Sequence, residues 1–210
     1  GIDVLHGNTK TLLLLSLTAW AVNLSLWSPL AAIFPTIGDY RIFIDLLILD
    51  LWIYGWHRLN HRLPWLWRFH QIHHLDQQLD ATSALRFHPG EVVLSALFRL
   101  PVILLLAMPL SSIVVFEILV AAAAIFHHSN VRLPVRAEKA LSLLVITPSI
   151  HWVHHHAARA DTASNYGTLL SCWDRVFRSR SATPRTGSMV LGVEGVQENQ
   201  MVKLILLPFR

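Results

Sequence analysis

The chain has 210 residues, of which 53% are hydrophobic and only 14% are charged, and its length fits a single domain covering residues 1–210. This charge is too sparse to cover the surface of a soluble domain of that size, so the composition favours an all-α integral membrane protein. The net charge of +4 does not indicate nucleic-acid binding, because the basic residues flank apolar runs and form no stripe with exposed aromatic residues.

Four apolar segments predict membrane-spanning helices, at about residues 11–34, 42–56, 92–108 and 110–126. Roughly 20 apolar residues suffice for a helix to cross the hydrocarbon core, and the last two segments lie near the lower limit. A short Pro/Gly turn at 35–39 joins the first pair, and Pro109 joins the second. Two such hairpins leave residues 57–90 and 127–210 on one side of the membrane, as a helical cap. These two regions hold 14 of the 17 Lys and Arg residues, which predicts that the cap is cytoplasmic.

Charged residues inside these segments need partners, because an isolated ion in hydrocarbon is costly. Asp50 shares a helical face with His57 and His61, so it is predicted either to orient a histidine or to sit in a polar cavity. Arg99 and Glu117 lie at comparable distances from Pro109, which predicts a structural ion pair between the third and fourth segments.

Histidine is the strongest chemical signal, since 12 of the 13 histidines lie between His57 and His156. Eight of them fall in three boxes: His57 and His61; His70, His73 and His74; and His151, His154 and His155. Spacings of three and four residues put the members of a box on one helical face, and neutral imidazole is a good ligand for first-row transition metals. The single cysteine, Cys172, excludes a thiolate cluster.

The number of histidines predicts two metal ions, because a tetrahedral zinc site uses only three or four ligands and His128 is a ninth candidate. No HExxH motif supplies the general base of a zinc protease, and Pro64 breaks the helix that paired haem ligands would require. Iron can activate O2 to remove hydrogen from an unactivated carbon, so the leading hypothesis is a di-iron, O2-dependent lipid oxidoreductase. The alternative is a histidine-rich membrane metal transporter or metal-binding protein, whose ligands would lie near the bilayer midplane. Zinc bound in a purified sample would not decide between them, because zinc can replace iron.

Seven motifs together resemble the fatty acid hydroxylase/sterol desaturase superfamily, in particular its compact bacterial members, over about residues 40–180. They are HRLNHR (57–62), PWLWRFHQIHH (64–74), RFHPGE (86–91), HSN (128–130), HWVHH (151–155), NYG (165–167) and WDRVF (173–177). The resemblance implies a four-helix transmembrane bundle with a cytosolic cap that holds a di-metal centre, in a bacterial inner membrane. It implies hydroxylation or desaturation of fatty acyl, sterol or related lipids.

By residue, the resemblance makes the eight box histidines and His128 the metal ligands. Some members of the superfamily have a further histidine four positions before His128, where this chain has Ala124. Electrons are expected from an external donor of ferredoxin or cytochrome b5 type, with its reductase. A basic face containing Arg132, Arg136, Arg159, Arg175 and Arg178 is predicted to dock that carrier.

Seven further residues are candidates for an extra ligand or for contacts that orient the ligands: His88, His127, His156, Asp50, Glu91, Asn130 and Asn165. Each also has an ordinary structural explanation. Glu91 suits the N-terminus of a helix, and the two asparagines suit caps or turns. The sequence does not identify the substrate lipid, and it does not choose between hydroxylation and desaturation.

Overall fold

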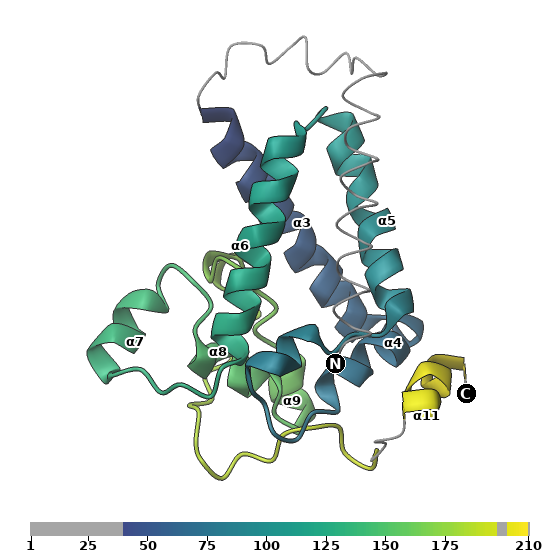
Figure 1. Ribbon diagram of the computed structural model, residues 1–210. Helices are drawn as coiled ribbons and strands as arrows, with labels where there is room; N and C mark the ends of the chain where they lie inside the picture. Colours follow the sequence, from purple (N-terminus) through teal and green to yellow (C-terminus); the bar gives the residue numbers. More distant parts are fainter. Residues whose placement is uncertain (1–39, 197–200, 210) are drawn as a thin grey trace.

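The computed structural model describes residues 40–196 and 201–209 of the chain (Figure 1). Its helices are α3 (Arg41–Arg62), α4 (Pro64–His74), η2 (Ala81–Leu85), α5 (Pro89–Leu105), α6 (Leu110–His128), α7 (Val135–Leu141), α8 (Pro148–His154), α9 (Arg159–Thr162), α10 (Cys172–Val176), α11 (Met201–Leu206) and η3 (Leu207–Phe209). Within these ranges no strand is formed, and only two isolated β-bridges occur. The prediction of an all-helical chain is therefore confirmed for the described part. The predicted first span, 11–34, and the turn at 35–39 lie outside the described residues.

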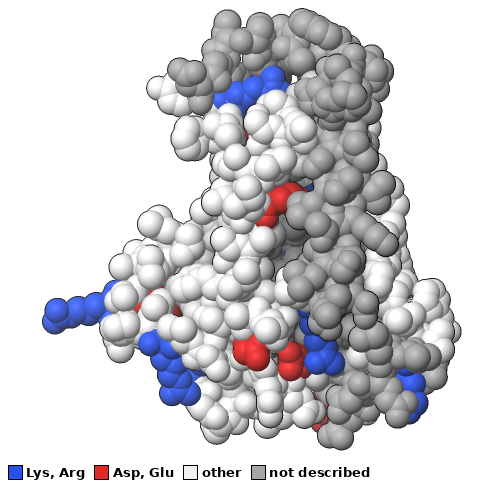
Figure 2. All heavy atoms as spheres, in the orientation of Figure 1, with Lys and Arg blue, Asp and Glu red and all other residues white. Residues whose placement is uncertain are grey.

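Three long helices, α3, α5 and α6, form a column, and the short helices gather at one end of it (Figure 1). The core of the column is apolar, with Leu49 of α3 packed among Val102 and Ile103 of α5 and Ile113 and Phe116 of α6. Burial of these side chains holds the three helices together. Figure 2 shows a mostly uncharged surface on the visible part of the column, with an acidic group about midway and most of the other charged side chains towards its ends.

Of the helices in the described ranges, α6 alone is long and apolar enough to cross a membrane by length and composition. Helix α5 has 17 residues, and α3 carries Arg41, Asp45 and Asp50 within its apolar stretch. Of the three predicted spans that fall within the described residues, one, in α6, thus has clear membrane-spanning character. Helix α5 is short, and the charged residues of α3 make that helix less apolar.

Each carboxylate of α3, α5 and α6 has a polar partner. The prediction that Arg99 and Glu117 form an ion pair is confirmed. Asp50 does not orient a histidine: its carboxylate accepts hydrogen bonds from the backbone N–H groups of Leu169 and Leu170 and from the indole N–H of Trp173. This carboxylate therefore anchors the segment before α10 to the middle of α3, because three donors converge on it in a buried setting.

The turn between α5 and α6 lies at the end of the column away from the histidines. Arg41 donates from Nη2 to the carbonyl oxygens of Leu106 and Ala107, at 2.8 and 2.6 Å. The last carbonyl groups of a helix lack intrahelical hydrogen-bond donors. Here the guanidinium of Arg41 is the donor. Ala107 has a φ of 45°, in the left-handed region that a residue with a Cβ rarely adopts, so the Arg41 contacts fix a strained turn.

Candidate metal centre

The three histidine boxes lie on helix ends that meet at the base of the column. His57 and His61 occupy the last turns of α3, and Pro64 at the start of α4 turns the chain so that the second box folds back against the first. Helix α8 begins at Pro148, and the Thr147 hydroxyl accepts a hydrogen bond from the N–H of Ile150. This capping residue fixes the start of the helix that carries the third box.

Nine histidines converge into two groups. The five-histidine group contains His57, His61, His70, His74 and His154, and the four-histidine group contains His73, His128, His151 and His155. Within each group, the ring nitrogen atoms that could serve as ligands all lie within 4.8 Å of one another. These nine are the same residues that the sequence predicts as ligands. His74 stacks on His155 with ring centroids 4.3 Å apart, so the two groups are direct neighbours.

Oxygen acceptors around the centre fix which ring nitrogen carries the proton in five of these histidines. The acceptors of the Nδ1 atoms are Tyr166 O for His57 (2.9 Å), Arg86 O for His73 (3.2 Å), Ala124 O for His128 (2.7 Å), Ser164 O for His154 (2.6 Å) and Glu91 Oε1 for His70 (2.6 Å). A backbone carbonyl only accepts hydrogen bonds, so the facing Nδ1 must be protonated. Each neutral ring then directs an unprotonated Nε2 inward.

These inward nitrogens are placed to bind a cation. The Nε2 atoms of His73 and His128 lie 3.0 Å apart, and those of His128 and His151 also lie 3.0 Å apart. The first of these contacts sets one lone pair against another. In the five-histidine group, seven ring nitrogens are buried without a partner among the described residues: Nε2 of His57, His70 and His154, and both ring nitrogens of His61 and of His74. A neutral imidazole carries one proton, so one nitrogen of each ring is unprotonated in His61 and His74 as well. Ligands cis to one another on a metal at about 2.1 Å are about 3 Å apart, so the residues fit two bound metal ions.

Burial keeps the imidazoles in the neutral form that binds metals. It lowers the pKa of His154 to about 3. The pKa values of His74 and His155 are likewise well below the usual range, because of burial and then of neighbouring imidazoles. A cluster of this density cannot hold several protons at once, whereas it can share a metal ion.

Glu91, at the start of α5, forms a hydrogen bond with the outward-facing nitrogen of the His70 ring. Its Oε1 accepts hydrogen bonds from Nδ1 of His70 at 2.6 Å and from Nδ2 of Asn60 at 3.2 Å, and the carboxylate is only 4% exposed. A carboxylate on the far nitrogen of a ligand histidine orients the ring and raises its basicity. The structure thus gives Glu91 a contact with the histidine cluster in addition to its place at a helix N-terminus.

A loop between α9 and α10 positions the His57 ring. Both oxygens of the Asp174 carboxylate accept backbone N–H groups, from Tyr166 and Gly167, at 2.8 and 2.9 Å. This clamp presents the carbonyl of Tyr166 to Nδ1 of His57. The loop is tightly packed at Gly167, where an added Cβ would lie 2.6 Å from the Ile146 side chain and 2.9 Å from the backbone oxygen of Leu170.

We expect Gly167→Ala to destabilise the protein by about 1–3 kcal/mol, because the new methyl group overlaps a backbone oxygen that cannot rotate away. The measurement is the thermal unfolding midpoint of the purified protein in detergent. The matched control is Gly55→Ala on α3, where nothing lies within 4 Å of the added Cβ and helix propensity favours alanine. Equal midpoints for the two variants would contradict the packing argument.

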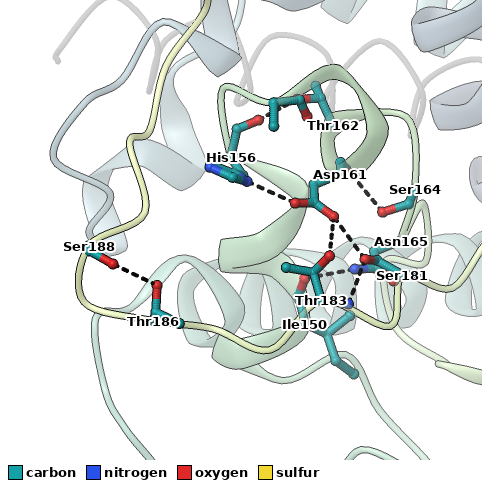
Figure 3. Close-up of polar contacts among 11 residues, drawn as sticks. Ile150, His156, Asp161, Thr162, Ser164, Asn165, Ser181, Thr183, Thr186 and Ser188 are labelled. Carbon is teal, nitrogen blue, oxygen red and sulfur yellow. Dashed lines mark hydrogen bonds and ion pairs between the residues drawn. The ribbon is translucent and has the colours of Figure 1, made fainter.

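Two of the other candidate histidines have partners outside the groups. Nδ1 of His88 accepts the N–H of Gly90 and its Nε2 lies 3.1 Å from the carbonyl of Ile205, so His88 caps α5 and contacts α11. The His156 ring donates to Asp161, which also accepts from the hydroxyls of Ser181 and Thr183 (Figure 3). Burial opposes ionisation of Asp161, but these hydrogen bonds outweigh it and lower the pKa of the carboxyl.

The last three candidates differ in their distance from the cluster. His127 is buried, and its ring centroid lies 4.0 Å from that of His151, yet it belongs to neither group. Asn165 donates to the carbonyl of Ile150 and accepts the N–H of Ser181, and with a φ of 53° it forms a turn (Figure 3). Asn130 is exposed, and its backbone carbonyl oxygen accepts a hydrogen bond from Arg185.

An apolar cavity of about 230 Å³ opens beside the histidines, between α3, α5 and α6. Histidines of both groups form one part of its wall, and Arg99 and Glu117 contribute to another. Aliphatic side chains such as Ile53, Val92 and Val120 also line it. A lipid chain in this space would be shielded from water beside the nitrogens that face inward.

Sequence reasoning missed three residues that support the centre: Asn60, Trp67 and Asp174. The WDRVF motif contains Asp174, but nothing in the sequence shows that this carboxylate clamps residues 166 and 167. Trp67 packs with its ring centroid 5.0 Å from that of His61 and 5.3 Å from that of His74.

Comparison with known proteins places this geometry in a family. The family model described as fatty acid hydroxylase matches residues 42–179, which contain all nine converging histidines. The chain belongs to the fatty acid hydroxylase family. Its relatives include the ornithine lipid hydroxylase OlsE of Rhizobium tropici, which is 30% identical over 171 residues, 81% of this chain and 50% of that protein.

More distant relatives carry different names. The alkylglycerol monooxygenase of Danio rerio is 28% identical over 83% of this chain and 38% of that protein, and the cholesterol 25-hydroxylase of Rattus norvegicus is 25% identical over 73% and 51%. The chain thus spans about half the length of these relatives or less. No solved structure matches the chain.

Proposed function

We propose that this protein is an O2-dependent di-iron enzyme that hydroxylates a C–H bond of a membrane lipid. The observation that carries the proposal is the convergence of unpartnered, unprotonated imidazole nitrogens beside an apolar cavity. The names of the relatives, all hydroxylases or monooxygenases, support insertion of oxygen over desaturation. The overall reaction would convert R–H, O2, two electrons and two protons to R–OH and water.

The proposed roles follow from the contacts. The five-histidine and four-histidine groups would each hold one iron ion, and iron bound there would supply the activation of O2. Glu91, the Tyr166 carbonyl and the Ser164 carbonyl keep His70, His57 and His154 in the tautomer that binds a metal. The aliphatic cavity wall would hold the lipid chain and exclude water from the reacting carbon.

We further propose that the chain forms one membrane domain with four spans in two hairpins and a cytoplasmic cap, in a bacterial inner membrane. The apolar surface of α6 and the gathering of the short helices at one end of the column support this arrangement. The nine converging histidines lie at the cap end of the long helices and not at their middle, which disfavours a metal transporter.

Lipid mass spectrometry tests the function directly. Cells that express the protein are expected to accumulate a lipid with one additional oxygen atom compared with cells that express His61→Ala, which removes a buried ring with two unpartnered nitrogens. A lipid that instead loses two hydrogens would reassign the reaction to desaturation. Identical lipids in both cultures, with transmembrane flux of zinc through the wild-type protein, would favour the transporter.

The electron donor should dock beside Trp67. This half-buried indole contacts two rings of the five-histidine group, the Arg159 guanidinium lies 5.8 Å from its centroid, and Arg159 also donates to the carbonyl of His61. Arg62 is exposed, and the positive charges of Arg62 and Arg159 both act on the hydroxyl of Tyr166, another ring beside the same group. The positive charges of Arg62 and Arg159 beside Trp67 suit the docking of an acidic one-electron carrier.

We expect the charge reversal Arg62→Glu/Arg159→Glu to raise the KM for a plant-type [2Fe–2S] ferredoxin by about tenfold or more, because it reverses attraction at the docking face. The matched control, Arg132→Glu/Arg136→Glu, changes the net charge equally near α7. The sequence prediction included these two arginines in the docking face, whereas the site proposed beside Trp67 leaves them out, so this KM should stay unchanged. Chemical reduction of the iron by dithionite should be the same in all three proteins. Equal ferredoxin KM values in the two variants would exclude this face.

A further inference from the structure

The Arg99–Glu117 ion pair lies in an unusual place. Both side chains are largely buried, at 7% and 14% exposure, between the long helices α5 and α6. Both also line the apolar cavity that holds the histidines in its wall. A buried ion pair often stabilises a protein no more than apolar side chains of similar volume, so its structural contribution alone gives little reason for it.

The pair presents more hydrogen-bonding capacity than its protein contacts use. Arg99 donates from Nη1 to Oε1 of Glu117 and from Nε to the carbonyl of Ser95. An arginine has five N–H donors, and a carboxylate has two accepting oxygens. Among the described residues, the remaining donors on Nη2 and the Oε2 acceptor have no hydrogen-bond partner, although both residues line the cavity.

The spacing along the helices separates this polar pair from the metal ligands. Arg99 follows Glu91, which holds His70, by eight residues of α5, or about 12 Å at 1.5 Å per residue. Glu117 precedes His128 by eleven residues of α6, or about 16 Å. The cavity wall between them includes Val92, Val120 and Ala121. One end of the space is therefore polar, the other faces the histidines, and the middle suits hydrocarbon.

We propose that Arg99 and Glu117 bind an uncharged polar group of the lipid substrate, a hydroxyl or an amide, and so place a carbon about 12 Å away at the histidine cluster. This inference rests on the proposed function. A hydroxyl can accept from Arg99 and donate to Glu117 at the same time. An anionic group would add a second negative charge beside Glu117 in an apolar setting, where the guanidinium charge is already compensated.

The test is retention of deuterated probes by the purified, metal-loaded protein in lipid nanodiscs, measured by mass spectrometry. The probes are 1-octadecanol, octadecane and octadecyl sulfate, the last anionic throughout. The wild-type protein is expected to retain octadecanol about tenfold better than the other two, as two added hydrogen bonds allow. The double variant Arg99→Met/Glu117→Met removes both charges together, so no unpaired ion is left to unfold the protein, and it should lose the preference.

The control is Arg41→Met/Asp45→Met, which removes a second ion pair that lies outside the cavity lining, and it should keep the preference. A wild-type protein without preference for octadecanol, or a double variant that retains it, would overturn the proposal and leave the pair as a cross-link between α5 and α6. Retention needs no turnover, so loss of the proposed enzymatic function would be seen separately, as octadecanol binding without oxygen insertion.

Discussion

His74→Ala is expected to reduce bound metal from two ions per chain to one or none, and to lower lipid hydroxylation by at least about a hundredfold. Both ring nitrogens of His74 are buried without a partner among the described residues, so no hydrogen bond competes with a metal for them. The ring also contacts His61 and His154 of its own group and His155 of the four-histidine group. Loss of a residue that only orients a metal ligand lowers metal affinity or activity by about 10–100-fold, so loss of a ligand itself should lower them further. Elemental analysis gives iron and zinc per chain.

The matched control for this experiment is His156→Gln. His156 adjoins the third box in sequence, but its ring donates to Asp161 and belongs to neither group, and glutamine retains a donor. We expect two metal ions per chain and near wild-type hydroxylation in this variant. If His156→Gln lost as much metal as His74→Ala, or if His74→Ala kept two ions, the assignment of the two histidine groups would be wrong.

Glu91→Gln is expected to weaken metal binding by the five-histidine group about 10–100-fold, with a similar loss of hydroxylation. The amide oxygen can still accept from His70 and preserve the packing, but the negative charge that raises the basicity of the imidazole is gone. The measurement is the metal content after dialysis against a graded series of chelator concentrations. Glu91→Ala should lose more, because Nδ1 of His70 and Nδ2 of Asn60 would both be left buried without an acceptor.

Asp161→Asn provides the comparison for Glu91→Gln, since it removes the charge of the second carboxylate that accepts a hydrogen bond from a histidine. Its partner, His156, lies outside both groups, so metal retention should change little. Equal metal loss in the two variants would mean that the carboxylate of Glu91 acts through general stability and not through His70.

The histidine boxes could be predicted from the sequence because their geometry is local. Spacings of three and four residues put side chains on one face of any helix, wherever that helix packs. For the same reason the sequence predicts two metal ions from the number of histidines, and the structure gathers the nine rings into two groups. The ion pair of Arg99 and Glu117 was also predictable, because a short turn at Pro109 fixes the relative height of residues on the two helices it joins.

The predicted spans in α3 and α5 show where local reasoning lost precision. Hydropathy alone does not show that the carboxylates of α3 are satisfied by the rest of the fold. Asp50 was predicted either to orient a histidine or to sit in a polar cavity. Its carboxylate instead accepts hydrogen bonds from backbone N–H groups some 120 residues later in the chain. Such partners depend on where the loop before α10 is placed.

What the sequence by itself determined is the set of nine converging imidazoles and their location on helix ends. Which of them work together was decided only by the tertiary structure. His73 and His74 are consecutive, but they join different groups, and so do His154 and His155. Consecutive residues of a helix point about 100° apart, so each pair reaches towards two centres, and only the packing of α3, α4, α6 and α8 determines which other rings meet them there.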